Sequence, residues 1–436
     1  MPPAQKLDPD QDGDRCQSSC VAGLAQVFLV EIETMKEWIR AVLVTLVALT
    51  FLSAVSVRPR QQGVDDTEIR IGNLMPYTGT LKGFGAIGRA EAAYFRMINE
   101  RGGINGRQVR FISYDDKSDP QAALALTRRL VEQDDVALMF GSFGTPGNFA
   151  VRKYLNEKEI PQIFIASGDD HLTDPSLFPW TIGWQPSPRE EGRIYANYIQ
   201  ANYSGKRIVA LWQNDQVGRE IFRGLEDGLG DVARMIRIDI AYDTADEQLD
   251  THVSILKQSG AEIFLFAGMP ADAARAIRTA ASLHWHPVFI VNQTASSIAA
   301  ALKPAGIENA VGVITAAFLK DATDPAWEGE PWQAFLHKIT REEGEDDVLA
   351  AFGYAAAETL VHVLKNCGND LSRETVIKAA TGLRSYQGAV LLPGIKIGLG
   401  PSNFRPIKHL RLVQFDGRTW QPIGDVLETA FSHSDN

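Results

Sequence analysis

A glycine-rich segment with the spacing of a nucleotide-binding loop is the first candidate for chemistry in this chain. Residues 83–88 read GFGAIG and fit the G-x-G-x-x-G pattern, which binds a dinucleotide when it follows a strand tightly and opens a helix. Residues 76–82 separate the motif from the preceding apolar segment, and the expected acidic residue comes late, at Asp115 or Asp116. An NAD-dependent oxidoreductase is therefore a remote alternative. We expect these glycines to let the backbone approach a ligand.

A second loop combines glycines with small hydroxyl residues. The segment 139–149 reads MFGSFGTPGNF and predicts a strand, a loop and a helix that starts near Pro146. Such a helix N-terminus presents unpaired N–H groups and the positive end of a dipole, which suit a carboxylate. Thr145 could also cap the helix, with Pro146 in its first turn, and the two roles are compatible. Residues 163–170, IFIASGDD, repeat this arrangement at the end of the next strand.

Other potential sites are weak. Asp8 to Gly13 begins like a calcium loop, but its closing position falls on Ser19 instead of Glu. His284 and His286 alternate without a third ligand motif nearby, which favours a half-buried strand over a metal site. The sequence contains no H-E-x-x-H, G-x-S-x-G or Walker pattern. We therefore expect a protein that is not an enzyme and that needs neither a metal nor a cofactor.

The elements that position these loops alternate regularly. Strands separated by helices predict an α/β fold with parallel sheets flanked by helices. Residues 180–188, WTIGWQPSP, interrupt the rhythm and are interpreted as the first connection between two lobes. Helices at 350–364 and 373–380 predict a return to the first lobe, and a hairpin at 407–423 is expected in the second. The other expected strands are 69–74, 109–114, 137–140, 162–165, 208–212, 237–241, 263–267 and 288–291; the other expected helices are 89–100, 119–133, 148–157, 190–201, 219–229, 248–258 and 271–283.

The amino-acid sequence of residues 69–120 resembles that of a known family. A strand that ends near a Thr-Gly loop, a helix that closes in N-x-x-G-G-I-N-G, and a strand that runs into Y-D-D and D-P are similar to periplasmic solute-binding proteins of the branched-chain amino-acid (Leu/Ile/Val) class. The resemblance implies a two-lobed periplasmic-binding-protein fold of type I with a multi-crossing hinge. In that family the loops after the third and fourth strands hold the ligand's carboxylate and main-chain groups. The matching positions are Thr145, Ala166 and Gly168, with Ser167 in the same loop.

The resemblance continues into the second lobe, where the departures bear on specificity. The segments QNDQVG (213–218) and FAGM (266–269) place Val217 and Met269 at the expected ligand site. Branched-chain amino-acid binders usually carry an acidic residue that binds the α-ammonium, and here Gln293 stands at that place. Val217 likewise stands where Tyr is common. A neutral site leaves a desolvated ammonium unpaired, which costs several kcal/mol.

The ligand is therefore expected to be a carboxylate without an α-amine. Phe84, Phe143 and Trp212 near the strand ends could form apolar walls for an aromatic ring, although each ring could equally belong to the core. The motifs Gly-Thr-Pro after the third strand, Gly-Trp-Gln-Pro and Gln-Asn-Asp resemble those of the subgroup of this family that is associated with aromatic and related acids. Asp169 and Asp170, beside the expected carboxylate loop, could still supply a negative charge, so amino acids stay open as ligands.

The N-terminal region predicts export. From Met35 the chain shows a positively charged start, an apolar run of about a dozen residues and a small-residue pattern that ends at Ser56, typical of a secretory signal peptide. An uncleaved anchor behind a short tail is the alternative. Cys16 and Cys20 precede Met35, so the mature chain would keep Cys367 alone and form no internal disulfide. We expect a soluble periplasmic monomer.

These observations together predict an organisation and a role. We expect a start codon assigned too early for 1–34, a signal peptide at 35–56, a linker at 57–67, lobe 1 at 68–186 with 316–388, and lobe 2 at 187–315 with 389–436. A net charge of −11 argues against nucleic acid as a partner. The resemblance implies a small-molecule ligand and delivery to an inner-membrane ABC permease with its ATPase. A ligand-sensing module of the same fold, in regulation or signalling, is the alternative.

Overall fold

The computed structural model describes residues 62–243, 246–343 and 347–428, together with Met35, Trp38 and Arg40. The chain divides into two compact units, Met1–Arg60 and Gln61–Asn436. The three described residues of the first unit are helical and exposed. The rest of the expected signal peptide and all of the segment before it lie outside the described residues.

The second unit contains two sheets, and the first of them is wholly parallel. Its strand order is β2-β1-β3-β4-β5. Strand β1 lies inside this sheet and is buried along almost its whole length, as expected for a parallel strand covered by helices on both faces. The strands are β1 (Glu68–Met75), β2 (Gln108–Asp115), β3 (Leu138–Phe140), β4 (Gln162–Ile165) and β5 (Thr181–Gly183). The helices that follow β1 to β3 are α2 (Gly85–Glu100), α3 (Pro120–Glu132) and α4 (Thr145–Glu157).

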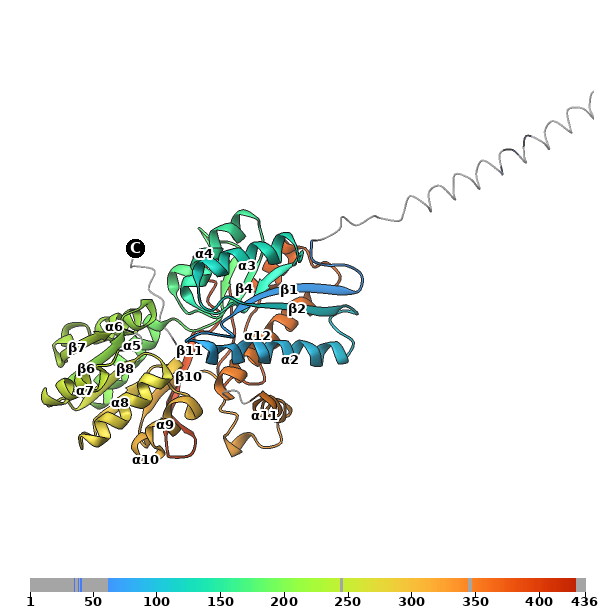
Figure 1. Cartoon of the computed structure of the whole chain (residues 1–436). Helices are drawn as coiled ribbons and strands as arrows, with labels where there is room; N and C mark the ends of the chain where they lie inside the picture. The colour runs from blue at the N-terminus through green and yellow to red at the C-terminus, as the bar shows by residue number, and fades with distance from the viewer. Residues whose placement is uncertain are drawn as a thin grey trace, which may run out of the picture. The chain divides into compact units, whose positions relative to one another are not determined.

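Two helices that are far apart in sequence pack closely against this sheet. Helix α12 (Asp347–Asn366) lies beside α2 (Figure 1). A Cβ atom on Gly353 would lie 2.4 Å from the backbone oxygen of Ile87, so glycine is needed for this close approach. Of the described residues, Val348–Asn366 is long and apolar enough to cross a membrane, but 72% of it is buried inside the protein, as in a core helix. Helices α11 (Pro331–Glu343) and α13 (Arg373–Thr381) pack beside α12.

The second sheet is mixed. Its order is β12-β11-β10-β9-β8-β6-β7, with parallel pairing from β10 to β7 and antiparallel pairing for β11 and β12. The hairpin predicted near the C-terminus is thus an edge of the second sheet. The strands are β6 (Ile208–Gln213), β7 (Ile236–Tyr242), β8 (Ile263–Ala267), β9 (Val288–Val291), β10 (Ile314–Ala317), β11 (His409–Phe415) and β12 (Trp420–Glu428). The main helices are α5 (Pro188–Asn202), α6 (Gln216–Leu229), α7 (Leu249–Gln258) and α8 (Pro270–Ser282).

The chain passes between the sheets three times, and backbone hydrogen bonds join the connections. The first connection follows β5, the second follows β10 and the third precedes β11. The N–H of Gly183, the last residue of β5, donates to the carbonyl of Phe404 over 3.1 Å, joining the start of the first connection to the third. The N–H of Lys320 donates to Val390, and that of Leu392 to Phe318, each over 2.9 Å, joining the second and third. The expected α/β fold with a multi-crossing hinge is confirmed, and β10 extends the second sheet to Ala317, past the expected boundary at 315.

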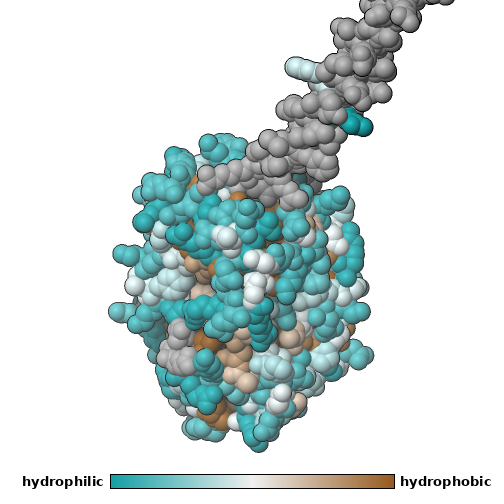
Figure 2. All heavy atoms as spheres, turned by 90° about the vertical axis from the view of Figure 1, so that its right-hand side faces the viewer, coloured by the Kyte–Doolittle hydropathy of each residue, from teal (hydrophilic) through white to brown (hydrophobic). Residues whose placement is uncertain are grey.

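The outer surface agrees with a water-exposed protein. The face shown in Figure 2 is covered mainly by hydrophilic side chains, with small scattered apolar areas. Apolar side chains gather instead in clusters around the two sheets, where burial of apolar area is the main source of folding free energy.

Candidate functional site

The loops after β3 and β4 meet at the carboxyl edge of the first sheet, where open α/β sheets bind ligands. The N–H of Ala166 donates to the carbonyl of Ser142 over 3.0 Å, and the N–H of Gly144 donates to Ala166 over 3.1 Å. The hydroxyl oxygens of Thr145 and Ser167 lie 2.8 Å apart. Both hydroxyls are therefore presented together, next to the start of α4.

The cap of α4 differs from the expected one. Gly144, with a φ of 92°, occupies the N-cap position, and Thr145 is the first residue of the helix. The interpretation of Thr145 as a helix cap is therefore wrong. Glycine has no side chain that could cap the first turn, and no side-chain cap hydrogen bond forms there; uncapped N–H groups at a helix N-terminus suit an anion. The Thr145 hydroxyl is directed to Ser167 instead.

A buried polar chain holds this loop in place, and sequence reasoning missed it. The Asn148 amide donates to the carbonyls of Ser142 and Gly144 over 2.9 and 2.7 Å. Gln162 donates to the amide oxygen of Asn148 over 2.7 Å and lies 3.1 Å from the Thr181 hydroxyl, which donates to it. The chain fixes the loop after β3 to strands β4 and β5. The sequence feature that could have indicated this chain is Asn148, an amide residue in the first helical turn after Gly-Thr-Pro.

Phe84 and Phe143, the two rings expected to form an apolar wall in the first lobe, lie against each other and pack with the hydrophobic core around the first sheet. The rings of Phe84 and Phe143 stack with centroids 4.5 Å apart and an interplanar angle of 23°. Phe84 is buried, and Phe143 is half-buried beside Thr145. The glycines of the G-x-G-x-x-G motif have another use: Cβ atoms on Gly85 and Gly88 would lie 2.9 and 2.5 Å from the Tyr77 side chain. They make room for this ring at the start of α2.

In the second lobe, Val217, Met269 and Gln293 follow β6, β8 and β9, which are neighbours in the sheet. Val217 and Met269 are half-buried, at the start of α6 and as the N-cap of α8. Among the described residues, no hydrogen bond or ring contact links these three to the first-lobe set of Phe84, Phe143, Thr145, Ala166, Ser167 and Gly168.

Trp212 takes a different position. Its indole N–H donates to Asp239 on β7 over 3.1 Å, and its ring stacks on Phe222 of α6 with an interplanar angle of 9°. The ring therefore packs between α6 and the edge strand β7, which gives it a structural role. The structure does not bring it together with Phe84 or Phe143.

A buried acidic residue lies directly behind Gln293. The Glu191 carboxyl accepts a hydrogen bond from the backbone N–H of Gln293 over 2.6 Å, and the Tyr195 hydroxyl lies 2.7 Å from the same oxygen. Glu191 is buried, and burial raises its pKa from 4.5 to about 7. Because its contacts are already made inside the protein, this carboxyl supports the Gln293 loop and is poorly placed to bind a ligand's ammonium.

Of the two aspartates that could supply a charge to the first-lobe loop, Asp170 is paired with a cation and Asp169 is only partly engaged. Asp170 forms an ion pair of 3.1 Å with Arg405 and accepts a hydrogen bond of 2.7 Å from the Ser187 hydroxyl. Asp169 is buried; its Oδ1 accepts the N–H of His171 over 2.8 Å, and its Oδ2 has no hydrogen-bond partner among the described residues. The negative charge of Asp170 is thus compensated by a cation of the protein itself.

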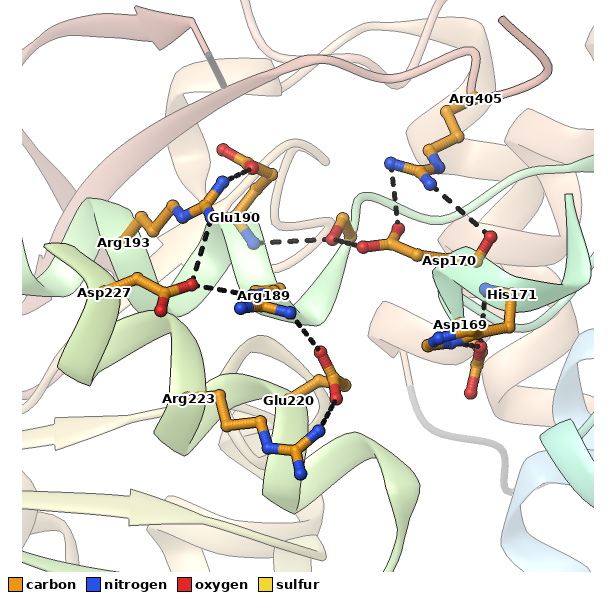
Figure 3. A network of polar contacts seen from close by, with 11 residues as sticks. Asp169, Asp170, His171, Arg189, Glu190, Arg193, Glu220, Arg223, Asp227 and Arg405 are labelled. Carbon is orange, nitrogen blue, oxygen red and sulfur yellow. Dashed lines mark hydrogen bonds and ion pairs between the residues drawn. The ribbon is translucent and has the colours of Figure 1, made fainter. Parts of the chain in front are cut away.

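The Asp170 pair begins a network that runs along the hinge (Figure 3). Arg405 comes from the third connection, Ser187 is the N-cap of α5, and Asp170 follows β4. Ser187 also accepts the N–H of Glu190, which pairs with Arg193 at 2.6 Å. The network continues through Arg193–Asp227, Arg189–Asp227, Arg189–Glu220 and Arg223–Glu220. It ties helices α5 and α6 of the second lobe to the first and third connections.

The described part of the chain contains no candidate metal site. Within residues 62–243, 246–343 and 347–428 there is no group of three His, Cys, Asp or Glu side chains that could hold a metal ion. Cys367 is a free thiol, and burial raises its pKa to about 11, which disfavours the reactive thiolate.

Comparison with known proteins identifies the class. A Leu/Ile/Val-binding protein homolog 1 from Brucella abortus is 22% identical over 344 residues, which span 75% of this chain and 89% of that protein. A branched-chain amino acid ABC transporter protein from Thermus thermophilus with bound valine superposes with a TM-score of 0.73 at 18% identity, over 84% of this chain and 98% of that one. A solute-binding protein from R. palustris in complex with benzoate superposes with a TM-score of 0.68 at 19% identity, over 84% and 98%.

The two hinged sheets with paired loops at their carboxyl edges define a type I binding protein. The chain belongs to the periplasmic binding protein family, which it matches over residues 68–419. Members of this family are solute-binding proteins of ABC transporters and are normally not enzymes. The resemblance noted in the sequence is confirmed.

Proposed function

We propose that this protein is the substrate-binding component of an ABC importer and captures a small carboxylate in the periplasm. The observation that carries this proposal is the pair of hydroxyls of Thr145 and Ser167, 2.8 Å apart, at a helix N-terminus without a capping side chain. Hydroxyls and helix N–H groups are donors that suit a carboxylate. The proposed ligand docks there first, on the first lobe.

Closure of the two lobes follows in this proposal. A ligand bound to the first lobe stabilises the closed form through added contacts with Val217, Met269 and Gln293, because a ligand shifts a conformational equilibrium by its differential affinity for the two forms. The inner-membrane permease then recognises the closed form. The signal peptide from Met35 brings the chain to the periplasm, and intact-mass analysis of periplasmic protein tests this by the loss of residues before Val57.

For the ligand class, we propose carboxylates without an α-amine, aromatic or similarly apolar. Gln293 is neutral, Glu191 is buried behind it, and Asp170 is paired with Arg405. An α-ammonium would find no free carboxylate among these groups, and Asp169, the other candidate, is buried beneath the loop surface. The stacked rings of Phe84 and Phe143 add an apolar wall.

Calorimetry with a ligand panel tests the proposal. Benzoate, a cinnamate-type acid, leucine and phenylalanine are titrated into the mature protein at pH 7. We expect micromolar or tighter binding of the aromatic acids and binding of leucine at least tenfold weaker. Micromolar leucine binding without a response to the aromatic acids would overturn the ligand class, and no binding of any carboxylate would overturn the capture role.

A further inference from the structure

A buried glutamate packs directly behind the loop that carries the proposed carboxylate site. Glu91 lies on helix α2 and is fully buried. It contacts the backbone of Gly141, the first residue after β3, where an added Cβ atom would overlap with the Oε1 atom of Glu91. Gly141 also has a φ of 64°, which suits glycine. The residues that follow Gly141 lead directly to Thr145, so the carboxyl supports the start of the binding loop.

Hydrogen bonds connect the Glu91 carboxyl with the same loop. Its Oε2 atom accepts a hydrogen bond of 3.2 Å from the side-chain amide of Asn73 on β1. The same amide nitrogen donates to the carbonyl of Phe140, the last residue of β3, over 2.8 Å. One residue further along β1, the carbonyl of Leu74 accepts the N–H of Phe143 over 3.1 Å. Strand β1 therefore holds the loop at two points, and Glu91 orients the amide that forms the first of them.

The chain of hydrogen bonds continues to the loop after β1. The Ser113 hydroxyl on β2 donates to the amide oxygen of Asn73 over 2.6 Å. Because the proton of Ser113 is used there, the Tyr77 hydroxyl, 2.7 Å away, donates to Ser113. Tyr77 lies in the loop after β1, and its ring packs against the start of α2. The chain from Tyr77 to Glu91 therefore joins the loops after β1 and β3, whose phenylalanine rings stack on each other.

The carboxyl takes part in this chain as a neutral acid. Burial raises the pKa of Glu91 well above its usual range. Its Oε2 atom accepts from Asn73, and its Oε1 atom has no hydrogen-bond partner among the described residues. The proton of the neutral acid therefore lies on Oε1, the atom that contacts Gly141. The neutral form also keeps a negative charge away from the loop, where it would repel a bound carboxylate.

We propose that Glu91 is a positioning residue for the carboxylate site: it supports Gly141 and, through Asn73, fixes the loop that presents the Thr145 hydroxyl to the ligand. This inference rests on the proposed function. Glu91 does not touch the ligand, because it is fully buried behind the loop. Its effect on affinity comes from preorganisation, since a loop that is already fixed need not be ordered when the ligand binds.

Calorimetry at pH 7 tests the proposal, with the acid that binds most tightly among benzoate, the cinnamate-type acid, leucine and phenylalanine. Glu91→Leu removes the acceptor for Asn73, whereas Glu91→Gln keeps a neutral acceptor of nearly the same shape. Glu358→Leu is the matched control, because this half-buried glutamate of α12 accepts the N–H of Ala389, in the third connection, over 2.8 Å. Thermal unfolding of each variant verifies that it is folded.

We expect Glu91→Leu to bind the acid about tenfold more weakly, because it loses a buried hydrogen bond and the support of the loop. Glu91→Gln and Glu358→Leu should bind it within about twofold of the wild type. An unchanged affinity in Glu91→Leu, or an equal loss in Glu91→Gln or Glu358→Leu, overturns the positioning role and leaves the capture role intact. If none of the four acids binds to the wild type, the capture role fails, and this inference with it.

A double-mutant cycle tests the contact with Gly141 and decides the question if Glu91→Leu does not fold. In Gly141→Ala the new methyl group overlaps with the carboxyl and displaces the loop, so the acid should bind about tenfold more weakly. Glu91→Ala makes room for this methyl group, so the double variant should bind about threefold more tightly than Gly141→Ala alone. The strain of the positive φ is present in both and cancels. Additive losses would overturn the proposed support of the loop by Glu91.

Discussion

The Glu191 carboxyl lies 2.6 Å from the backbone nitrogen of Gln293 and thereby joins helix α5, just after the first connection, to the loop after β9. Tyr195 lies beside this contact: its hydroxyl is 2.7 Å from Glu191, 3.0 Å from the carbonyl of Val291, and accepts the N–H of Ala316 over 3.1 Å. A hydroxyl has one proton, so it cannot donate to both acceptors. A protonated Glu191 resolves the conflict by donating to Tyr195 while Tyr195 donates to Val291.

This arrangement predicts a stability that depends on pH. Because burial raises the pKa of Glu191 from 4.5 to about 7, the neutral form stabilises the fold fully below pH 4.5, and this contribution is lost as the pH rises to 7. The loss is on the order of 3 kcal/mol. The Gln side chain in Glu191→Gln stays neutral at every pH. Urea unfolding at pH 5 and pH 8 should therefore show a decrease in the free energy of unfolding for the wild type that is absent in this variant. An identical pH dependence in both proteins would contradict the assignment.

The hinge network predicts a large effect of removing its cation. Arg405→Met leaves the carboxylate of Asp170, which is 21% exposed, without its 3.1 Å partner. An unpaired and largely buried charge should lower the free energy of unfolding by about 3 kcal/mol. Urea unfolding at pH 7 measures the change. Lys153→Met is the control, since its pair with Glu157 is exposed and should contribute less than about 0.5 kcal/mol. Equal effects of the two substitutions would mean that Asp170 does not depend on Arg405.

Regular elements could be predicted from the sequence where apolar runs are long and bounded by turn residues. Strands β4, β8 and β9 have the expected limits, since β8 and β9 are unbroken apolar runs and β4 is apolar after its first residue, Gln162. Strands β5 and β10 were missed. The first is three residues long and lies in a segment with two prolines, and the second, ITAA, lacks a distinct apolar pattern. Helix α4, expected to start near Pro146, begins at Thr145, directly after Gly144, which adopts a positive φ that suits glycine.

The site could be predicted only as loops, since contacts between them depend on the tertiary structure. The position of Thr145 followed from its place after a strand, whereas its contact with Ser167 needs the two loops side by side. The position of the Trp212 ring could not be predicted in this way. Strand residues alternate between the two faces of a sheet, and the sequence does not show that the face carrying Trp212 is covered by α6. The Asn148 chain was missed because its partners, Gln162 and Thr181, lie on other strands.

The contact between α2 and α12 predicts a strict requirement for glycine. In Gly353→Ala, the new methyl group would lie 2.4 Å from the backbone oxygen of Ile87, so the helices must separate. Overpacking should lower the free energy of unfolding by about 1 to 3 kcal/mol. Gly147→Ala in α4 is the matched control, because its methyl group would meet Ala123 at an ordinary 3.6 Å, and it should be neutral or stabilising. Thermal unfolding distinguishes them, and a neutral Gly353→Ala would show that the helices can adjust.

The proposed carboxylate site predicts a specific role for the Thr145 hydroxyl. Thr145→Val removes a donor to a charged group, worth about 1.5 to 3 kcal/mol, so benzoate should bind at least tenfold more weakly. Thr145→Ser keeps the hydroxyl and should bind within about twofold of the wild type. Benzamide, which lacks the charge, should bind weakly and lose little further affinity in Thr145→Val. Calorimetry measures all three, and unchanged benzoate affinity in the valine variant would exclude this anchor.

The neutral Gln293 side chain predicts that specificity can be changed with one charge. In Gln293→Glu, a carboxylate stands where the amide has no partner among the described residues, while the backbone contact with Glu191 is kept. An α-ammonium then finds an acceptor, so phenylalanine should bind at least tenfold more tightly than to the wild type. Carboxylates without an amine should lose affinity, because the new charge repels them. Gln293→Met, which is neutral and of similar size, is the control and should not gain phenylalanine binding. The reading of Gln293 as the residue that excludes amines fails if both variants respond alike to phenylalanine and cinnamate in competition calorimetry.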